Sequence, residues 1–391
     1  MSRSVKAWDL QQVSGVFIIA AIALGMIAAN SPLSSMYWTI HHTPIQVQFG
    51  PYGIEEPLIS WINDGLMVFF FLLVGLEIKR EILEGRLSTP AKVALPIFSA
   101  VGGMLFPALI YASLTWNDAI AINGWAISTA TDIVLALGIL SLLGAKVPIS
   151  LKVFLTAVAI FDDIGAVLII GLFYSDELSS IPLLISLIAT GTLLLTNSYR
   201  IDRVWVYIVV GSLLWIAMLK AGVEAALAGV IIAFAVPMRV AKQDNSPSPV
   251  RILEERLEVW VPFAIVPLFA FFNAGVKIEP GLLASLTEPI SLGIILGLVV
   301  GKPIGIFGSA IVAVQLGFGR LPSGVNWGQM FGVAMLAGIG FTMSLFVASL
   351  AFSDVSVMAS AKIAVLSASF FAAISGLTVL YVALPGPARA S

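Results

Sequence analysis

Long apolar segments recur along the whole chain and strongly limit what it can fold into. The run FIIAAIALGMIAA, residues 17–29, is apolar on every side. The strands of a membrane β-barrel would instead alternate apolar and polar residues over about ten positions. A helix satisfies its own backbone hydrogen bonds in lipid, and about 20 apolar residues are enough to cross a bilayer. We therefore predict an all-α polytopic membrane protein.

The composition supports this prediction and excludes several classes of protein. Hydrophobic residues make up 59% of the chain and charged residues only 11%, with a mean hydropathy of +1.03. A soluble domain has about 25% charged residues, so this chain has too little polar surface to be a soluble globule. The net charge of −2 argues against a nucleic-acid binder or a polybasic surface protein. Cysteine is absent, which excludes disulfides and thiolate chemistry.

Dividing the chain at charges, prolines and glycines predicts twelve spans within one transporter domain, residues 1–391. They lie near residues 11–29, 58–84, 94–115, 120–143, 149–174, 181–199, 204–219, 223–237, 253–273, 289–314, 327–350 and 356–384. With the N-terminus inside, the inner segments hold 16 Lys and Arg residues and the outer segments hold 2. Because positively charged loops remain in the cytoplasm, this split predicts cytoplasmic N- and C-termini.

Two loops have recognisable patterns. The outer loop at residues 30–57 contains TPIQVQFGPYGIEE, an alternating segment with a Gly-Pro-Tyr-Gly turn, which predicts a small β-hairpin. This hairpin is either an ordered loop or an exposed strand edge that pairs with a second copy. The segment 238–250 is polar and proline-rich, so we expect a flexible inner linker.

Four charged residues lie near the middle of predicted spans, where each costs about 2.5–3.5 kcal/mol. They are Asp132, Asp162, Asp163 and Lys302. Asp64 is a weaker fifth, because it lies near the outer end of its span. Residues of this kind usually mark an ion or proton path. The structural alternative is an ion pair that locks two helices, although one lysine cannot neutralise two adjacent aspartates.

The adjacent aspartates have the chemistry of an exchange site. Neighbouring positions on a helix point about 100° apart, so Asp162 and Asp163 can line one cavity. Two carboxylates this close titrate as a coupled unit and can exchange protons for a hard cation. Oxygen ligands suit Na⁺ or Li⁺ for the same reason that they suit other hard cations.

Polar or small residues interrupt the middle of two predicted spans: Ser128, Thr129, Thr131 and Asp132 in one, and Gly338, Gly340, Thr342 and Ser344 in the other. Such residues form either a packing seam between helices or a pair of interrupted helices at a midplane site. Interrupted helix ends carry partial charges, which Asp132 and Lys302 could offset. Lys362 lies nearer the outer end of its span, where snorkelling to the membrane surface is the simpler interpretation.

A second group of charges lies at the predicted inner side: Glu77, Arg80, Glu81 and Glu84 in one segment, and Glu254, Glu255 and Glu258 in another. Spacings of three and four place the first group on one helical face. The group is either a set of solvated helix ends or a proton-sensitive entrance, since crowded carboxylates repel one another and respond to pH.

Other mechanisms fit the sequence poorly. The segment GLVVGKP lacks the spacing and the Ser or Thr of a phosphate loop, so ATP is not the expected energy source. No predicted span contains histidine, and the aspartyl protease signature GxGD is absent. We predict a secondary transporter that is not an enzyme and needs no cofactor. Its substrates are Na⁺, Li⁺ and H⁺. Another cation-coupled transporter or a channel is the alternative.

Together these segments resemble the NhaA family of bacterial sodium/proton antiporters over essentially the whole chain. The motifs that carry the resemblance are INDGLMVFFFLLVGLEIKREI, STATDIVLALG, VAIFDDIG, VPLFAFFNAGV, GKPIG and GIGFTMSLFVASLAF. The resemblance implies twelve helices with inverted-topology repeats, here near residues 94–174 and 289–384, a feature for which this family is a standard example. It also implies that spans four and eleven are interrupted and cross at mid-membrane.

The resemblance assigns roles by position. It implies that Asp163 is the main cation ligand, with Asp162 beside it, and that Lys302 pairs with the aspartates. It matches Thr131 and Asp132 to helix-break residues that also belong to the ion-binding and proton-exchange site. It matches Gly338, Gly340 and Thr342 to the other broken helix. Glu77, Glu81 and Glu254 match acidic positions linked to pH regulation, and Arg80 lies among them. The family further implies electrogenic exchange for sodium and pH homeostasis, the bacterial inner membrane, and a homodimer formed through the hairpin at 44–56.

One departure from the family concerns histidine. Some members carry histidines at the start of span eight and around span nine, where this chain has Glu224, Glu255 and Glu258. Its only histidines, His41 and His42, lie in the outer loop. Because histidine is the usual switch near neutral pH, carboxylates or lysines must gate this protein if pH gates it.

Overall fold

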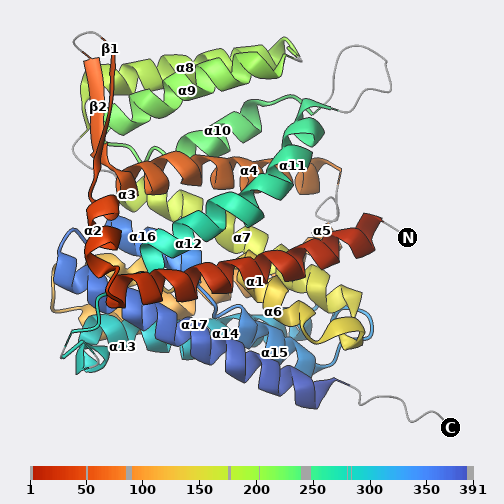
Figure 1. Ribbon diagram of the computed structural model, residues 1–391. Helices are drawn as coiled ribbons and strands as arrows, with labels where there is room; N and C mark the ends of the chain where they lie inside the picture. Colours follow the sequence, from red (N-terminus) through yellow and green to blue (C-terminus); the bar gives the residue numbers. More distant parts are fainter. Residues whose placement is uncertain are drawn as a thin grey trace. The chain divides into compact units, whose positions relative to one another are not determined.

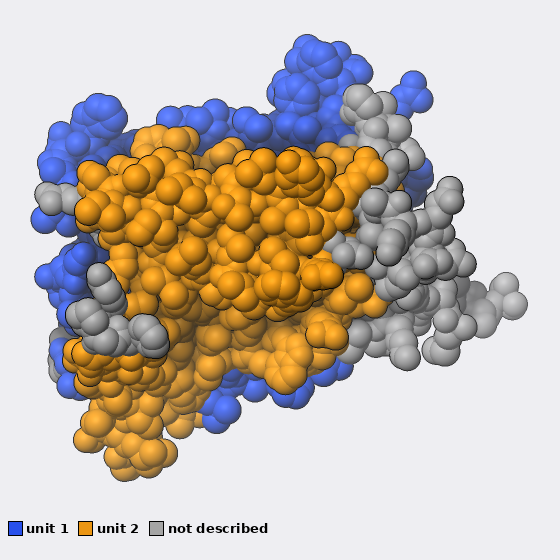
Figure 2. All heavy atoms as spheres, turned by 90° about the horizontal axis from the view of Figure 1, so that it is seen from above, with its two compact units in different colours: residues 1–26, 89–166, 273–391 blue, residues 27–88, 167–272 orange. Residues whose placement is uncertain are grey.

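Helices dominate the computed structural model, which describes residues 3–49, 52–84, 90–174, 178–201, 203–238, 248–279, 281–282 and 284–384 (Figure 1). The predicted linker at 238–250 falls mostly outside these residues. By its internal contacts the chain divides into two compact units (Figure 2). Unit 1 contains residues 1–26, 89–166 and 273–391, and unit 2 contains residues 27–88 and 167–272.

Within the described residues, nine helices are long and apolar enough to cross a membrane. They are Val13–Asn30, Leu58–Leu83, Val93–Thr115, Ile149–Phe173, Ser180–Ser198, Val204–Ala221, Pro249–Ala274, Pro289–Gln315 and Val355–Ala383. A bent pair, α15 (Trp327–Leu336) and α16 (Phe341–Ala351), makes ten if it is counted as one span. The protein is therefore a multi-pass membrane protein, as the sequence predicts.

Two of the twelve predicted spans differ from simple membrane helices. The predicted span 120–143 contains a short 3₁₀ helix, η3 (Ala121–Ala126), followed by α6 (Ile133–Ser141). The predicted span 223–237 contains α10 (Leu227–Ala235). α6 and α10 have nine residues each, fewer than the roughly 20 needed to cross the hydrocarbon core. The segment 120–143 is thus interrupted, which is one of the two alternatives that its polar residues left open, whereas the predicted span 223–237 is longer than its helix.

Unit 1 combines long helices with interrupted ones. Its remaining elements are α1 (Arg3–Asn30, shared with unit 2), α5 (Pro90–Thr115), η4 (Gly144–Lys146), α7 (Ile149–Phe173, shared with unit 2), η6 (Ala284–Thr287), α13 (Pro289–Leu296), η7 (Gly297–Gly301), α14 (Lys302–Gln315) and α17 (Val355–Ala383). α5 and α14 pack closely because both present glycine. A Cβ added at Gly305 would collide with the backbone of Gly102. Small residues bring helices together in this way in membranes.

Unit 2 contains the hairpin and most of the remaining helices. Its elements are α2 (Ser34–His41), β1 (Pro44–Phe49), β2 (Tyr52–Pro57), α3 (Leu58–Ser60), η1 (Trp61–Leu66), α4 (Met67–Leu83), α8 (Ser180–Ser198), α9 (Val204–Ala221), α10, α11 (Pro249–Trp260), η5 (Val261–Ile265) and α12 (Val266–Ala274, shared with unit 1). The predicted hairpin is confirmed: β1 and β2 pair antiparallel, with Val47 opposite Ile54. Trp61 Nε1 donates to Ile45 O at 3.2 Å and Lys220 Nζ donates to Gly53 O at 2.8 Å, which ties the hairpin to its own unit.

Side-chain caps define where two helices of unit 1 begin. Asn326 and Gln329 form a reciprocal capping box at α15. At α17 the carboxylate of Asp354 accepts from the backbone N–H groups of Ser356 (2.8 Å) and Val357 (3.1 Å). The hydrogen bond from the Ser356 hydroxyl, together with these backbone bonds, lowers the pKa of Asp354 from its usual value.

Candidate functional site

The two adjacent aspartates lie in the middle of α7, in unit 1, and both are buried. Asp162 is 1% exposed and Asp163 is 2% exposed. Lys302, the first residue of α14, is completely buried, and its Nζ lies 2.8 Å from Asp162 Oδ2. The structure thus forms the ion pair that the sequence left as an alternative, with one lysine beside two carboxylates. A second buried carboxylate next to this pair leaves the site an excess of acidic groups.

Two further groups hold this ion pair in place. The Thr131 hydroxyl donates to Asp162 Oδ2 at 2.7 Å, so this oxygen accepts from both Thr131 and Lys302. Lys302 Nζ also donates to the carbonyl oxygen of Thr129. Within the described residues, the other oxygen of this carboxylate, Asp162 Oδ1, is buried and accepts no hydrogen bond. Oxygens of this kind can bind a proton or a hard cation.

Residues 127–132 and 337–340 interrupt two helical segments and are bonded directly to each other. The backbone N–H of Asp132 donates to Ile339 O at 2.6 Å. The Thr131 hydroxyl is 2.9 Å from Ala337 O, and the Ser344 hydroxyl donates to Ile127 O at 2.6 Å. α15 and α16 meet at an angle of 44°. The polar residues therefore occupy real helix interruptions and are more than a packing seam.

Asp132 caps the starts of two helices at once. Its Oδ1 accepts from the backbone N–H of Leu135 at 3.0 Å, in the first turn of α6. Its Oδ2 accepts from the backbone N–H of Thr342 at 3.0 Å and from the Thr342 hydroxyl at 2.5 Å, in the first turn of α16. Helix N-termini carry partial positive charge, and a carboxylate is a preferred cap. The single negative charge of Asp132 therefore offsets both helix ends.

Glycine is required at the second interruption. A Cβ at Gly338 would collide with the carbonyl oxygen of Leu298, and a Cβ at Gly340 would collide with the Ser344 hydroxyl. The predicted break residues Gly338, Gly340 and Thr342 therefore lie together with Thr131 and Asp132.

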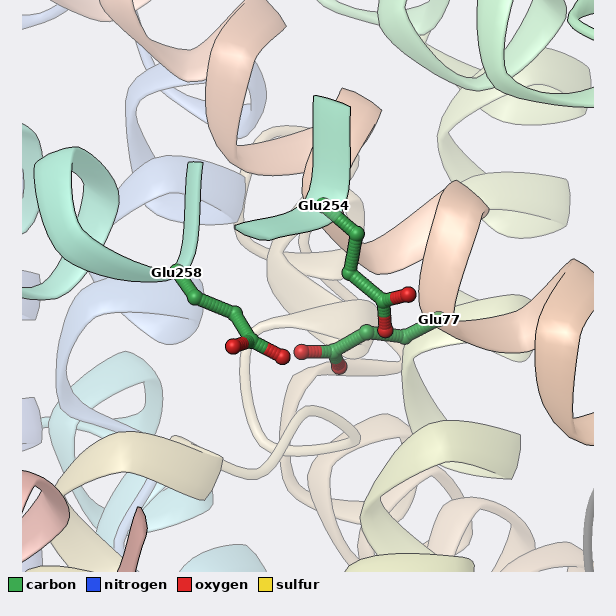
Figure 3. Close-up of side chains that lie close together, drawn as sticks. All are labelled: Glu77, Glu254 and Glu258. Carbon is green, nitrogen blue, oxygen red and sulfur yellow. The ribbon is translucent and has the colours of Figure 1, made fainter. Parts of the chain in front are cut away.

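The predicted acidic group is assembled in unit 2, where α4 meets α11. Carboxylate oxygens of Glu77, Glu254 and Glu258 lie within 4.8 Å of one another (Figure 3). Arg80 Nε is 2.6 Å from Glu254 Oε1, and Arg80 Nη1 is 3.2 Å from Glu81 Oε1. The Glu254 side chain is only 6% exposed, so it is not a solvated helix end. Three converging carboxylates can attract a proton or a hydrated cation.

The other charged residues within predicted spans lie elsewhere. Asp64 belongs to unit 2, in the π-helix η1, and its carbonyl oxygen accepts from Trp215 Nε1 at 2.9 Å. Lys362 is only 8% exposed within unit 1, so its side chain is buried in protein. The snorkelling interpretation, which requires an exposed ammonium group, does not fit this position.

The sequence did not single out Lys79 as a structural anchor. Its buried ammonium group donates to the carbonyl oxygens of Ala233, Phe234 and Val236, at the end of α10. Cations favour helix C-termini because the last carbonyl groups lack helical partners. The sequence shows only that Lys79 follows the apolar half of α4. The three carbonyl groups that it contacts lie more than 150 residues away along the chain.

Comparison with known proteins gives one consistent result. Residues 6–380 match the family model described as Na⁺/H⁺ antiporter 1. The chain is 51% identical over 353 residues to Na(+)/H(+) antiporter NhaA 2 of Shewanella denitrificans, covering 90% of this chain and 88% of that protein. It is 48% identical over 386 residues to the NhaA antiporter of Rhodospirillum rubrum, covering 97% of each chain. The protein with these two buried aspartates and two helix interruptions therefore belongs to the Na⁺/H⁺ antiporter 1 family.

Proposed function

We propose that this protein is a secondary transporter, not an enzyme, that exchanges cytoplasmic Na⁺ for external protons. Its relatives are named as Na(+)/H(+) antiporters. The observation that carries the proposal is the pair of adjacent buried carboxylates, one of them 2.8 Å from a buried lysine. This arrangement holds either protons or a small cation, and the exchange needs no cofactor.

The geometry suggests how one site serves both ions. Asp163 is the main cation ligand and Asp162 the second. Because Asp162 Oδ2 already accepts from Lys302 and Thr131, a cation that binds Asp162 must separate it from Lys302. Facing outward, the site takes up protons and releases Na⁺, and facing inward it does the reverse. Exchange of more than one proton per cation makes the cycle electrogenic, at about 2.3 kcal/mol per charge per 100 mV. Li⁺ is expected to replace Na⁺.

We assign Asp132 a different role from the two exchanging aspartates. Its oxygens accept from Leu135 and Thr342 at two helix starts, which supports a fixed anion that holds the interrupted helices together. Gly338, Gly340 and Thr342 allow the second interruption. Asp64 is proposed as a secondary residue of the ion or proton path.

The order of elements in unit 1 supports the proposed inverted repeats, 94–174 and 289–384. Each has a long helical segment, an interrupted one and another long helix: α5, η3–α6 and α7 in the first, and α13–α14, α15–α16 and α17 in the second. We propose that both interrupted segments span the membrane and cross at its middle. With α10 as part of a further span, the total is twelve, and both termini face the cytoplasm.

The acidic cluster of unit 2 is proposed as the pH-sensitive cytoplasmic entrance. Glu77, Arg80, Glu81 and Glu254 are its members, and the contacts of Arg80 with two of these carboxylates support a linked response. We also propose a homodimer through the hairpin at 44–56, in the lipid of a bacterial inner membrane.

Everted membrane vesicles with an acid interior test the proposal. Added Na⁺ or Li⁺ should dissipate the pH gradient, K⁺ should have little effect, and Asp163→Asn should abolish the response. An absence of any Na⁺ response from neutral to alkaline pH would refute the exchange. A Na⁺ current without proton movement would indicate the channel alternative.

A further inference from the structure

Ser128 is a buried polar residue of the first helix interruption. It lies between η3 and α6 and is completely buried. Its Oγ has no hydrogen-bond partner among the residues that the structure describes. By contrast, the neighbouring hydroxyls of Thr129 and Thr131 are both bonded, to Ala126 O and to Asp162 and Ala337 O. Burying a hydroxyl without a partner is unfavourable, so this position requires an explanation.

The Ser128 side chain packs against the π-helical turn that leads to Lys302. A Cβ added at Gly297 would lie 2.6 Å from Ser128 Oγ and 2.7 Å from Ser128 Cβ. Gly297 begins η7, and Lys302 follows five residues later. In a π-helix, residues five apart lie one turn above each other. Only glycine at position 297 therefore lets the serine hydroxyl approach this turn so closely.

The direction of the lysine side chain brings its ammonium group to the same place. Side chains of a helix lean toward its N-terminus, so the Lys302 stem extends back over the turn that contains Gly297. The bond from Lys302 Nζ to the carbonyl oxygen of Thr129, the residue next to Ser128, agrees with this direction. The ammonium group of Lys302 therefore lies beside the chain segment that contains Ser128.

During the exchange, the ammonium group of Lys302 needs a hydrogen-bond acceptor near Ser128. An ammonium group has three donors and no acceptor, and here it uses Asp162 Oδ2 and Thr129 O. When a cation binds the carboxylate of Asp162, one N–H donor of the Lys302 ammonium group loses its acceptor while the group remains completely buried. A serine hydroxyl offers two acceptor lone pairs, and that of Ser128 is not otherwise engaged in the described structure.

We propose that Ser128 is a positioning residue whose hydroxyl oxygen accepts a hydrogen bond from Lys302 when a bound cation separates Lys302 from Asp162. This inference rests on the proposed exchange at Asp162 and Asp163. Ser128 thereby stabilises the cation-bound form of the site and sets its affinity for Na⁺, without contacting the cation itself.

The first test compares Ser128→Ala with the wild type in everted vesicles. The KM for Na⁺ should rise by roughly tenfold, the factor expected for one hydrogen bond to a charged group, while the maximal rate stays within about twofold. Ser128→Cys, whose sulfur is a weak acceptor, should have a KM between those of the wild type and Ser128→Ala. It also serves as a second variant if the alanine variant folds poorly. Ser99→Ala is the matched control, because Ser99 is also completely buried in unit 1 and its Oγ has no partner among the described residues.

The second test asks whether Ser128 acts through Lys302. Na⁺-dependent thermal stabilisation of the purified protein is measured, so that variants inactive in transport remain informative. Ser128→Ala should weaken this stabilisation in the wild-type background and have no added effect in a Lys302→Met background. An equal effect in both backgrounds, or an unchanged KM in Ser128→Ala and Ser128→Cys, would overturn the inference. Absence of Na⁺-dependent proton movement in the wild type would instead overturn the proposed exchange.

Discussion

The two charged clusters of this protein use similar groups in opposite ways. In unit 1, Lys302 faces Asp162 with both side chains completely buried, and Asp163 lies beside them. In unit 2, Arg80 bridges Glu254 and Glu81 while its own side chain remains 35% exposed. Among the described residues, carboxylates outnumber cations in each cluster. The difference lies in burial and in the identity of the cation.

That difference fits two tasks. Lysine is a compact charge on a flexible stem, whereas arginine is always charged and binds carboxylates through a planar fork. A buried lysine can be displaced by another small cation, which suits an exchange site. A partly exposed arginine stays charged, which suits the proposed entrance that responds to pH.

The largest effect should come from breaking the buried pair of unit 1. Lys302→Met alone should destabilise the protein by about 3–5 kcal/mol, because it leaves the buried Asp162 carboxylate uncompensated. Asp162→Asn should cost less, because Asp163 remains beside Lys302. The double variant should recover part of this loss. Chemical unfolding in detergent micelles measures the free energy of unfolding of the single variants and of the double variant. If the double variant is destabilised by as much as the two single variants added together, the pairing is contradicted.

A smaller effect is expected where the helix interruptions meet. Asp132→Ala should cost about 2 kcal/mol, since it removes the caps of two helices and one cap is worth about 1 kcal/mol. Asp132→Asn should cost less, because its amide oxygen can still accept at one helix start. The same unfolding assay checks this order. A larger cost for the asparagine variant would argue against the double cap.

The cluster of unit 2 should be more tolerant. Arg80→Gln should cost about 1 kcal/mol or less, because a pair that is partly exposed contributes little. The maximal rate of exchange should remain near that of the wild type, while the pH of half-maximal activity moves. A series of exchange assays at different pH values tests this, with Arg251→Gln, which removes the exposed contact to Glu84, as control. Loss of exchange at every pH would place Arg80 in the exchange site.

The smallest effect concerns the exposed cap of α17. The hydrogen bonds from Ser356 and Val357 lower the pKa of Asp354, so the folded state favours the ionised form. This stabilisation is present above the unfolded value, about 3.9, and is lost as the pH falls through the lower value in the folded protein. Asp354→Asn should therefore reduce the loss of thermal stability on acidification. An identical acid profile in both proteins would contradict this prediction.

Local patterns were sufficient for part of the fold and of the candidate site. The hairpin was predicted because alternation and a turn are local features. The buried aspartates were found because charge inside an apolar run is conspicuous. The interruption before α6 was one of two alternatives that the polar residues left open, whereas the short length of α10 was not predicted, since apolar content does not reveal where a helix starts. Glu258 belonged to a group that the sequence left open between solvated helix ends and a pH-sensitive entrance, and its convergence with Glu77 from a distant helix could not be predicted.

The sequence by itself determined that this chain is a membrane protein and that Asp132, Asp162, Asp163 and Lys302 are its costly charges, because a charged residue within a long apolar segment is recognisable without knowledge of the rest of the fold. Only the tertiary structure decided their partners. Thr342 reaches Asp132 from 210 residues away, and Lys302 reaches Thr129 from 173 residues away. Hydrogen bonds depend on angles and tenths of an ångström, and no spacing in the sequence contains that information.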